Sequence, residues 1–304
     1  MVDKTTIRIL SLDGGNLLNA GVPLFVLSEI EQRLSKPIHS LFDVIAGVGS
    51  SSFCAAGLTI PDEGGDLNNA TDLATFYMHQ AKNFTNKTGF GKSNFANLMK
   101  SFFKESLLSE AKVELLLPMM DLQRSELVEV ASWNARANTA DGTPKPRDFV
   151  VADLVTKATT GTTQKNLKPL TAKDGSKHLF ATGEEALSNP TQVLHSAVRQ
   201  LCGDATKVEV VSIGNGYPDE QTSLANLKTM RTEVFGQHMQ SAVANVIAKQ
   251  VHKDMARDKT VAMYRRFDHQ VEVGAGHKQT MQSLIKTRDD VAVAMKQLDL
   301  GFLT

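Results

Sequence analysis

The residues with the clearest chemical setting lie in the stretch FDVIAGVGSSSFCAAGL, residues 42–58. A short apolar run leads into a glycine-containing turn and then into small apolar residues, which predicts a buried strand, a sharp turn and a helix. Hydrolases place a serine nucleophile on such a turn, in the pattern Gly-x-Ser-x-Gly. Here the turn at residues 47–51 is GVGSS, so Gly49 stands where the pattern has its serine.

Three other segments show the same pattern, in which an apolar strand ends in a polar or glycine-rich turn. The run TIRILSL ends in Asp-Gly-Gly-Asn at residues 13–16 and predicts a parallel strand followed by a tight turn. The segment LFATGEEALSNPT, residues 179–191, predicts a short strand, a polar loop and a helix that starts near Pro190. The run VVSIGNG, residues 210–216, predicts a buried strand that ends at a glycine turn.

This ordered set of segments resembles the patatin-like phospholipases. The likeness runs from Ile7 to about Gly216, with a weaker continuation through YRRF at residues 264–267 and the final helix. In that family the first turn is Asp-Gly-Gly-Gly followed by a basic residue, and its backbone amides form an oxyanion hole. The nucleophile is the serine of the elbow, and the base is an aspartate in Asp-Gly-Gly or Asp-Gly-Ala. The resemblance therefore implies a fatty acyl ester hydrolase with a Ser-Asp dyad and no metal.

Carried over residue by residue, the packing positions match the family and the chemical positions do not. Gly47 matches the first glycine of the elbow, but Gly49 replaces the serine and Ser51 replaces the last glycine. Thr182 stands at the position of the aspartate, although the Asn-Pro-Thr stretch at residues 189–191 matches. Gly49 has no side chain and Thr182 is neutral near pH 7, so neither can supply the chemistry of the dyad. The resemblance thus predicts the fold together with the loss of the family's reaction.

The turn that resembles the oxyanion hole is altered as well. Asp13, Gly14 and Gly15 match the family's first turn, whereas Asn16 replaces the third glycine and Leu18 replaces the basic residue. Asparagine adopts the left-handed conformation more easily than most residues, so we expect the turn to survive. The candidate oxyanion-hole residues are therefore Gly14, Gly15 and Asn16, without the nearby positive charge.

A relocated pair of residues would preserve activity. Ser50 follows the elbow tip and Glu184 lies two residues after the base position, so these two residues form the fallback dyad. In an elbow, however, the residue after the tip mainly offers its amide to the oxyanion hole. Residues 50–52 are more simply explained as capping and first-turn residues of the following helix. Glu184 and Glu185 are expected to be solvated loop side chains, so the loss of activity remains the favoured interpretation.

The pattern of elements predicts one α/β domain over residues 1–304, with a three-layer α/β/α patatin-like fold and a mainly parallel central sheet. Its core is expected at about residues 7–216. Extra C-terminal helices are expected over about residues 227–304, with a break around YRRFDHQVEVGAGH. A helix is predicted over residues 22–34, and another is expected to begin after a cap at Asn69 or Thr71. We find no internal repeat, low-complexity segment or linker.

Composition argues against several classes of function. The 33 basic and 33 acidic residues give zero net charge, so nothing predicts a nucleic-acid partner. The eight histidines are scattered without a His-Glu-x-x-His motif, so no metal and no cofactor are expected. No apolar run approaches the about 18 residues of a membrane span, and the N-terminus has no signal pattern. A cytoplasmic protein with reduced thiols at Cys54 and Cys202 is expected, with export by another route left open.

Three functions remain. The first is a pseudoenzyme that serves as a binding, regulatory or assembly module, with a lipid or fatty acyl ligand or a protein partner. The second is an active lipid acyl hydrolase, a phospholipase or esterase, that uses Ser50. The third is a structural protein that assembles into a homo-oligomer. The replacement of both dyad members favours the first.

Overall fold

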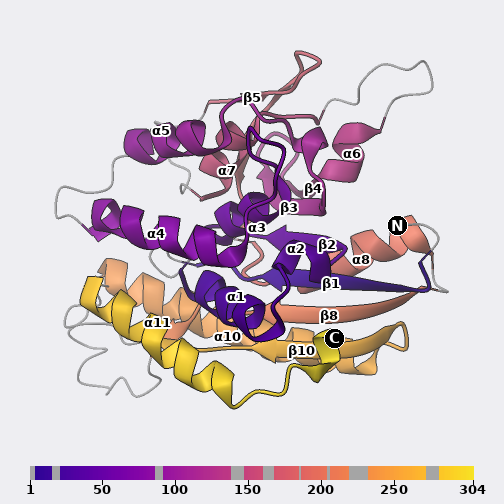
Figure 1. The fold of residues 1–304 in the computed structure, drawn as a ribbon. Coiled ribbons are helices and arrows are strands. Elements are labelled where there is room, and N and C mark those ends of the chain that lie inside the picture. Colours follow the sequence, from indigo (N-terminus) through magenta and orange to yellow (C-terminus); the bar gives the residue numbers. More distant parts are fainter. Residues whose placement is uncertain are drawn as a thin grey trace.

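The chain folds around a seven-stranded sheet in a computed structural model (Figure 1). The structure describes residues 4–15, 21–85, 92–137, 147–159, 168–184, 186–203, 206–218, 232–271 and 281–304. Six strands follow the order β10-β8-β1-β2-β3-β4, and β7 also pairs with β3. The strands are β1 (Thr6–Leu12), β2 (Val44–Gly47), β3 (Glu114–Asp121), β4 (Glu126–Ala131), β7 (Phe180–Thr182), β8 (Lys207–Ile213) and β10 (Val261–Phe267). The pairs from β10 to β3 are parallel, whereas β4 and β7 run antiparallel to β3.

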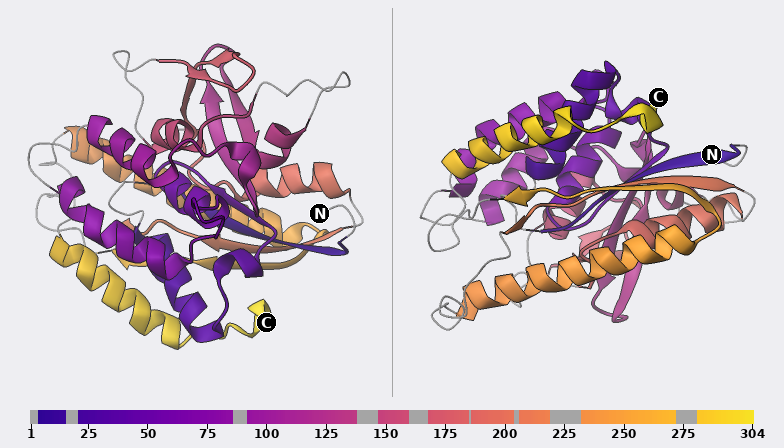
Figure 2. Two further views of the ribbon diagram at one scale, coloured as in Figure 1. Left: turned by 45° about the horizontal axis from the view of Figure 1, so that its top comes forward. Right: turned by 90° about the horizontal axis from the view of Figure 1, so that it is seen from below.

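Helices cover both faces of this sheet. The longer helices are α1 (Gly21–Leu34), α3 (Ser51–Thr59), α4 (Ala70–Thr85), α5 (Lys92–Phe103), α7 (Val151–Thr159), α8 (Thr191–Cys202), α10 (Thr232–Arg257) and α11 (Met281–Lys296). Figure 2 shows α1, α4 and α11 on one side of the sheet and α8 with α10 on the other. The predicted three-layer α/β/α architecture with a mainly parallel sheet and C-terminal helices is therefore confirmed.

Shorter elements complete the described chain. They are α2 (Ile38–Leu41), α6 (Ser132–Arg136), the 3-10 helices Leu108–Glu110 and Gly301–Leu303, the pair β5 (Leu170–Thr171) with β6 (Lys177–His178), and the pair β9 (Tyr217–Pro218) with β11 (Gln270–Val271). The cap of α4 is as predicted, because the Asp72 amide donates to Asn69 Oδ1 at 2.7 Å. No helix in the described part of the chain is long and apolar enough to cross a bilayer.

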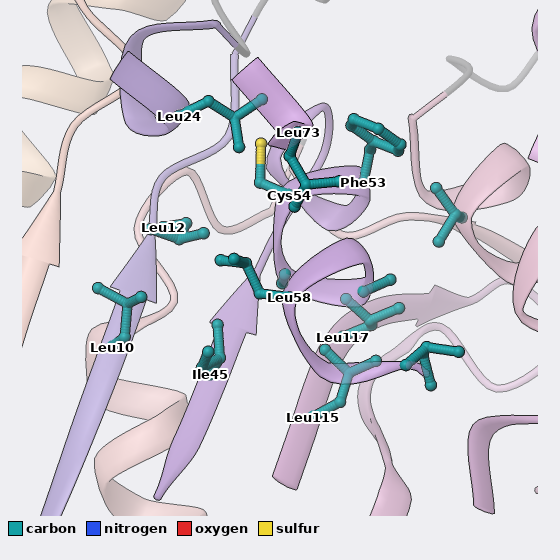
Figure 3. Close-up of a cluster of buried hydrophobic side chains, with 14 of the residues drawn as sticks. Leu10, Leu12, Leu24, Ile45, Phe53, Cys54, Leu58, Leu73, Leu115 and Leu117 are labelled. Atoms are coloured by element: carbon teal, nitrogen blue, oxygen red, sulfur yellow. The ribbon is translucent and has the colours of Figure 1, made fainter. Parts of the chain in front are cut away.

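Alternation along the strands divides the core between the two faces. In β1, Leu10 and Leu12 point to the side of α1 and α3, while Ile7 and Ile9 point to the side of α8. Burying one such side chain stabilises the fold by about 1.5–3 kcal/mol. Figure 3 shows the larger cluster, in which leucines of β1 and β3 and Ile45 of β2 meet α3. Its labelled members are Leu10, Leu12, Leu24, Ile45, Phe53, Cys54, Leu58, Leu73, Leu115 and Leu117.

The C-terminal part of the chain behaves as expected only in part. The break in the C-terminal helices contains β10, an edge strand of the main sheet, which we did not predict. Most residues of β10 are half-buried, so its sequence carries no clean alternation of apolar and polar residues. The thiols of Cys54 and Cys202 are both free, as predicted.

Candidate functional site at the elbow

The turn between β2 and α3 has the geometry of an elbow. Gly49 adopts the left-handed conformation at φ +58°, one residue after Val48 and two before the helix begins. A Cβ on Gly47 would overlap the Ser51 carbonyl oxygen, so only glycine allows the strand and the helix to approach this closely. Gly49 therefore lies at the tip of a strained turn, where the resemblance places a nucleophile.

Glu184 occupies the space next to the elbow tip. A Cβ on Gly49 would lie 2.8 Å from Glu184 Cδ and would overlap Glu184 Oε2. The same side chain passes the first turn, because a Cβ on Gly14 would lie 2.9 Å from Glu184 Cγ. Glu184 is half-buried, so the expectation of a solvated loop side chain is wrong for this residue. Glu185 lies outside the described residues.

Thr182, at the position of the family's aspartate, contributes to the structure of the loop. It is buried, ends β7 opposite Met119, and its Oγ1 accepts a hydrogen bond from the Glu184 amide at 3.2 Å. A Cβ on Gly183 would overlap the Pro118 carbonyl oxygen, so the chain between these residues is pressed against β3. Thr182 and Gly183 together fix the backbone from which Glu184 projects.

The first turn is bound to its neighbours through backbone amides. The Asp13 amide donates to the Ile213 carbonyl at 3.0 Å, and the Gly14 amide donates to the Ser188 carbonyl at 2.8 Å. The Gly14 amide is thus engaged in the fold rather than directed at a substrate. Gly15 closely approaches Asn215, since a Cβ there would lie 2.8 Å from Asn215 Nδ2. Asn16 and Leu18 lie outside the described residues.

The serines after Gly49 join the elbow to the first turn. Ser50 is only 1% exposed, and its Oγ accepts a hydrogen bond from Asn215 Nδ2 at 2.8 Å. Ser51 Oγ donates to the Asp13 carbonyl at 2.7 Å. Ser51 and Ser52 are first-turn residues of α3 as expected, but the predicted capping by Ser50 is wrong, because its side chain makes no capping hydrogen bond.

An ion cluster that is buried at Asp13 and exposed at Asp268 lies beside the first turn. The Arg266 guanidinium of β10 donates to Asp13 Oδ2 at 2.6 Å, to Ser212 Oγ at 2.7 Å and to both oxygens of Asp268. Burial raises the pKa of the Asp13 carboxyl from 3.8 to about 6, while Arg266 opposes the shift and Asp268 adds to it. Two carboxylates share one guanidinium here, and the more buried of the two retains its proton more readily.

Sequence reasoning missed two residues that shape this site. Arg266 belongs to the YRRF segment, which was noted only as a weak continuation of the resemblance. Asn215 belongs to a glycine turn that was interpreted as a strand end. No clear signal for Arg266 existed in the sequence, because β10 has mixed polarity and half-buried residues. Among the described residues, no group of three or more His, Cys, Asp or Glu side chains is arranged to hold a metal ion.

Comparison with known proteins agrees with the resemblance. No family model matches the chain. The chain is 29% identical over 150 residues to patatin-like protein 1 of Arabidopsis thaliana, which covers 42% of this chain and 36% of that protein. It is 23% identical over 258 residues to patatin-like protein 3 of the same plant, and this alignment covers 69% of this chain and 59% of that protein. The aligned segments thus span less than two thirds of the length of both relatives.

A solved structure also resembles the chain. The crystal structure of VipD from Legionella pneumophila superposes with a TM-score of 0.44 at 10% identity, covering 96% of this chain and 67% of that one. Together, the sequence relatives support a relationship between this chain and patatin-like proteins.

Proposed function

We propose that the chain is a divergent patatin-like protein that has lost acyl hydrolase chemistry and acts as a binding, regulatory or assembly module. The observation that carries this proposal is the occupied elbow tip. Gly49 offers no nucleophile, and a Cβ at that position would overlap Glu184 Oε2. An active enzyme of this type requires the opposite arrangement, in which a hydroxyl projects from the tip into open space.

The base position supports the same conclusion. Thr182 is neutral near pH 7, and its hydroxyl oxygen accepts the Glu184 amide, so it is not available to take a proton from a nucleophile. The alternative of a hydrolase that uses Ser50 is less well supported. Ser50 is buried and its Oγ is held by Asn215, whereas a nucleophile must be exposed to its substrate and bonded to a base.

A lipid or fatty acyl ligand is the class of partner that the patatin-like relatives suggest. A cytoplasmic location, a single domain over residues 1–304 and self-association remain predictions from the sequence. The resemblance to a hydrolase family gives the ligand class only by analogy, because the same fold can host unrelated functions.

Esterase assays with matched variants test the loss of activity. Wild type and Ser50→Ala are incubated with p-nitrophenyl butyrate and with phospholipid vesicles, beside the triple variant Gly49→Ser/Thr182→Asp/Glu184→Gly. Wild type is expected to stay at the background rate, because loss of catalytic residues costs up to about 10⁶-fold in kcat. The triple variant restores both dyad positions and clears the tip, so measurable turnover is expected from it alone.

The control for the triple variant carries Gly49→Ala in place of Gly49→Ser, with the other two substitutions unchanged. It keeps the cleared tip without the hydroxyl, so it is expected to be inactive. Turnover by wild type that Ser50→Ala abolishes would contradict the proposal and establish the relocated hydrolase instead.

A further inference from the structure

The side chain of Glu184 lies across two turns that are distant in sequence. A Cβ on Gly14 would lie 2.9 Å from Glu184 Cγ, and a Cβ on Gly49 would lie 2.8 Å from Glu184 Cδ. The aliphatic part of Glu184 therefore passes the first turn, and its carboxylate ends at the elbow tip. Both glycines permit this arrangement because neither has a side chain in the way.

The elbow tip is a favourable place for a carboxylate. Gly49 directly precedes the residue before α3, a nine-residue helix whose first N–H groups lack partners within the helix. The positive end of a helix dipole stabilises a nearby negative charge. The independent observation is that this protein already places a carboxylate there, so the tip acts as an anion site with an internal occupant.

A second buried polar group near the tip lacks a partner. Asn215 is 4% exposed and lies between the two turns, where its Nδ2 donates to Ser50 Oγ. Its Oδ1 is buried and accepts no hydrogen bond from any residue that the structure describes. Buried acceptors in proteins are normally satisfied by a donor or by an ordered water. A carboxylate cannot donate to this oxygen, but a water that donates one hydrogen to Asn215 Oδ1 and the other to a bound carboxylate would satisfy it.

Glu184 can leave the tip without a change in the sheet. Its backbone is held by Thr182 Oγ1, and Gly183 is pressed against Pro118 of β3. The overlap with a Cβ at Gly49 involves the far end of the side chain. A glutamate side chain rotates about three torsions, so its carboxylate can move to solvent while the loop stays in place.

We infer that Glu184 is an internal carboxylate ligand of the elbow, which an external carboxylate with an alkyl chain must displace in order to bind. This inference rests on the proposed binding function and adds the group that controls access to the site. The apparent affinity for the external carboxylate is then reduced by the fraction of molecules in which Glu184 occupies the tip.

Titration calorimetry with sodium octanoate tests this inference on the full chain. Wild type is compared with Glu184→Ala, which empties the tip, and with Glu184→Gln, which keeps the bulk of the side chain. Glu126→Ala removes an exposed carboxylate from β4 and is the matched control. Circular dichroism verifies that each variant is folded, and 1-octanol serves as the uncharged ligand.

Glu184→Ala is expected to bind octanoate at least about tenfold more tightly than wild type, because the competing occupant is gone. Glu184→Gln is also expected to bind octanoate more tightly than wild type, because its neutral amide competes less well for a place that favours negative charge. Glu126→Ala is expected to match wild type. The affinity for 1-octanol is expected to be the same in all four proteins.

Three other results would contradict the inference or the binding function on which it rests. Equal octanoate affinity in wild type and Glu184→Ala overturns the inference and leaves the binding function intact. Wild-type octanoate affinity in Glu184→Gln, or an equal gain for 1-octanol, would show that side-chain volume and not charge limits binding, and overturns displacement of a carboxylate by a carboxylate. Failure of every variant to bind octanoate contradicts both the inference and the proposed lipid-binding function.

Discussion

At the scale of single residues, Glu184 occupies the small volume at the elbow tip that a side chain at position 49 would need. Two effects oppose a side chain at Gly49: the left-handed backbone at φ +58° and the overlap with Glu184. A non-glycine residue in a left-handed conformation costs about 1 kcal/mol or more. The overlap adds a second cost that depends on whether Glu184 is present.

A double-mutant cycle separates the two costs. Gly49→Ala is expected to lower the free energy of unfolding by about 2 kcal/mol in wild type and by about 1 kcal/mol in Glu184→Ala, measured by urea denaturation. Gly175→Ala is the control, because Gly175 has φ +85° and nothing within 4 Å of its Cβ position. Its cost should be the same in both backgrounds. A cost of Gly49→Ala that is independent of Glu184 would show that the two residues do not share this volume.

The residues of the site were predictable only in part. The place of the elbow and the absence of a nucleophile follow from glycine spacing, which is local in sequence. The position of Glu184 does not, because an acidic residue in a polar loop is usually solvated, and only the packing of β7 on β3 brings it over Gly49. The hydrogen bond between Ser50 and Asn215 joins residues that are far apart in the chain, so no local pattern encodes it.

At the scale of elements, one buried carboxylate connects three helices. Glu31 of α1 is 7% exposed. Its Oε1 accepts the Ile38 amide at the start of α2 at 2.9 Å, and its Oε2 accepts the Thr71 amide near the start of α4 at 3.1 Å. The first amides of a helix have no partner within the helix. A carboxylate that accepts hydrogen bonds from two such amides also interacts favourably with the positive ends of both helix dipoles.

Removal of this carboxylate should therefore loosen the helices on one face of the sheet. Glu31→Ala is expected to lower the free energy of unfolding by about 3 kcal/mol, because hydrogen bonds to a charged group contribute about 1.5–3 kcal/mol each. The buried Ile38 amide and the part-buried Thr71 amide both lose their acceptor. Urea denaturation measures the change. Glu29→Ala on the same helix should stay within about 0.5 kcal/mol of wild type. Equal effects of both substitutions would contradict the capping function of Glu31.

The helices and strands were largely predictable where the sequence shows one clear hydrophobic pattern. Strand β2 is a continuous apolar run, β1 and β8 are rich in buried Ile, Leu and Val, and α1 shows helical spacing, so their patterns identify them. Strand β10 was not identified because it lies at the edge of the sheet and has mostly half-buried residues of mixed polarity. Its position depends on pairing with β8, which is determined by tertiary structure and not by local propensity.

At the scale of the whole molecule, the ion pair between Asp13 and Arg266 joins β10 to the turn after β1. The folded Asp13 has a pKa of about 6, above its usual 3.8. A carboxyl whose folded pKa is raised binds its proton more tightly in the folded state. Its contribution to stability is therefore fully present below about pH 4 and is lost as the pH rises to about 6.

Comparison with Asp13→Asn isolates this contribution, since asparagine keeps an acceptor for Arg266 but does not titrate. The stability of wild type relative to Asp13→Asn is expected to fall by up to about 3 kcal/mol between pH 4 and pH 6.5, measured by urea denaturation at each pH. Asp268→Asn removes the competing carboxylate and should make this fall smaller. Parallel stability curves for wild type and Asp13→Asn would contradict the raised pKa.

The position of β1 in the sheet has a consequence for synthesis on the ribosome. This strand precedes the other strands of the sheet in the sequence, yet one of its two neighbours is β8 at residues 207–213. At about 5–20 residues per second, roughly 10–40 s separate the translation of β1 from that of β8. During that interval one edge of β1 is unpaired, and unpaired edges are sites of aggregation. The ion pair of Asp13 in the first turn forms later still, because Arg266 follows β8 in the sequence. The strand that later lies in the interior of the sheet is therefore an open edge, and so a site for aggregation, while the chain is being synthesised.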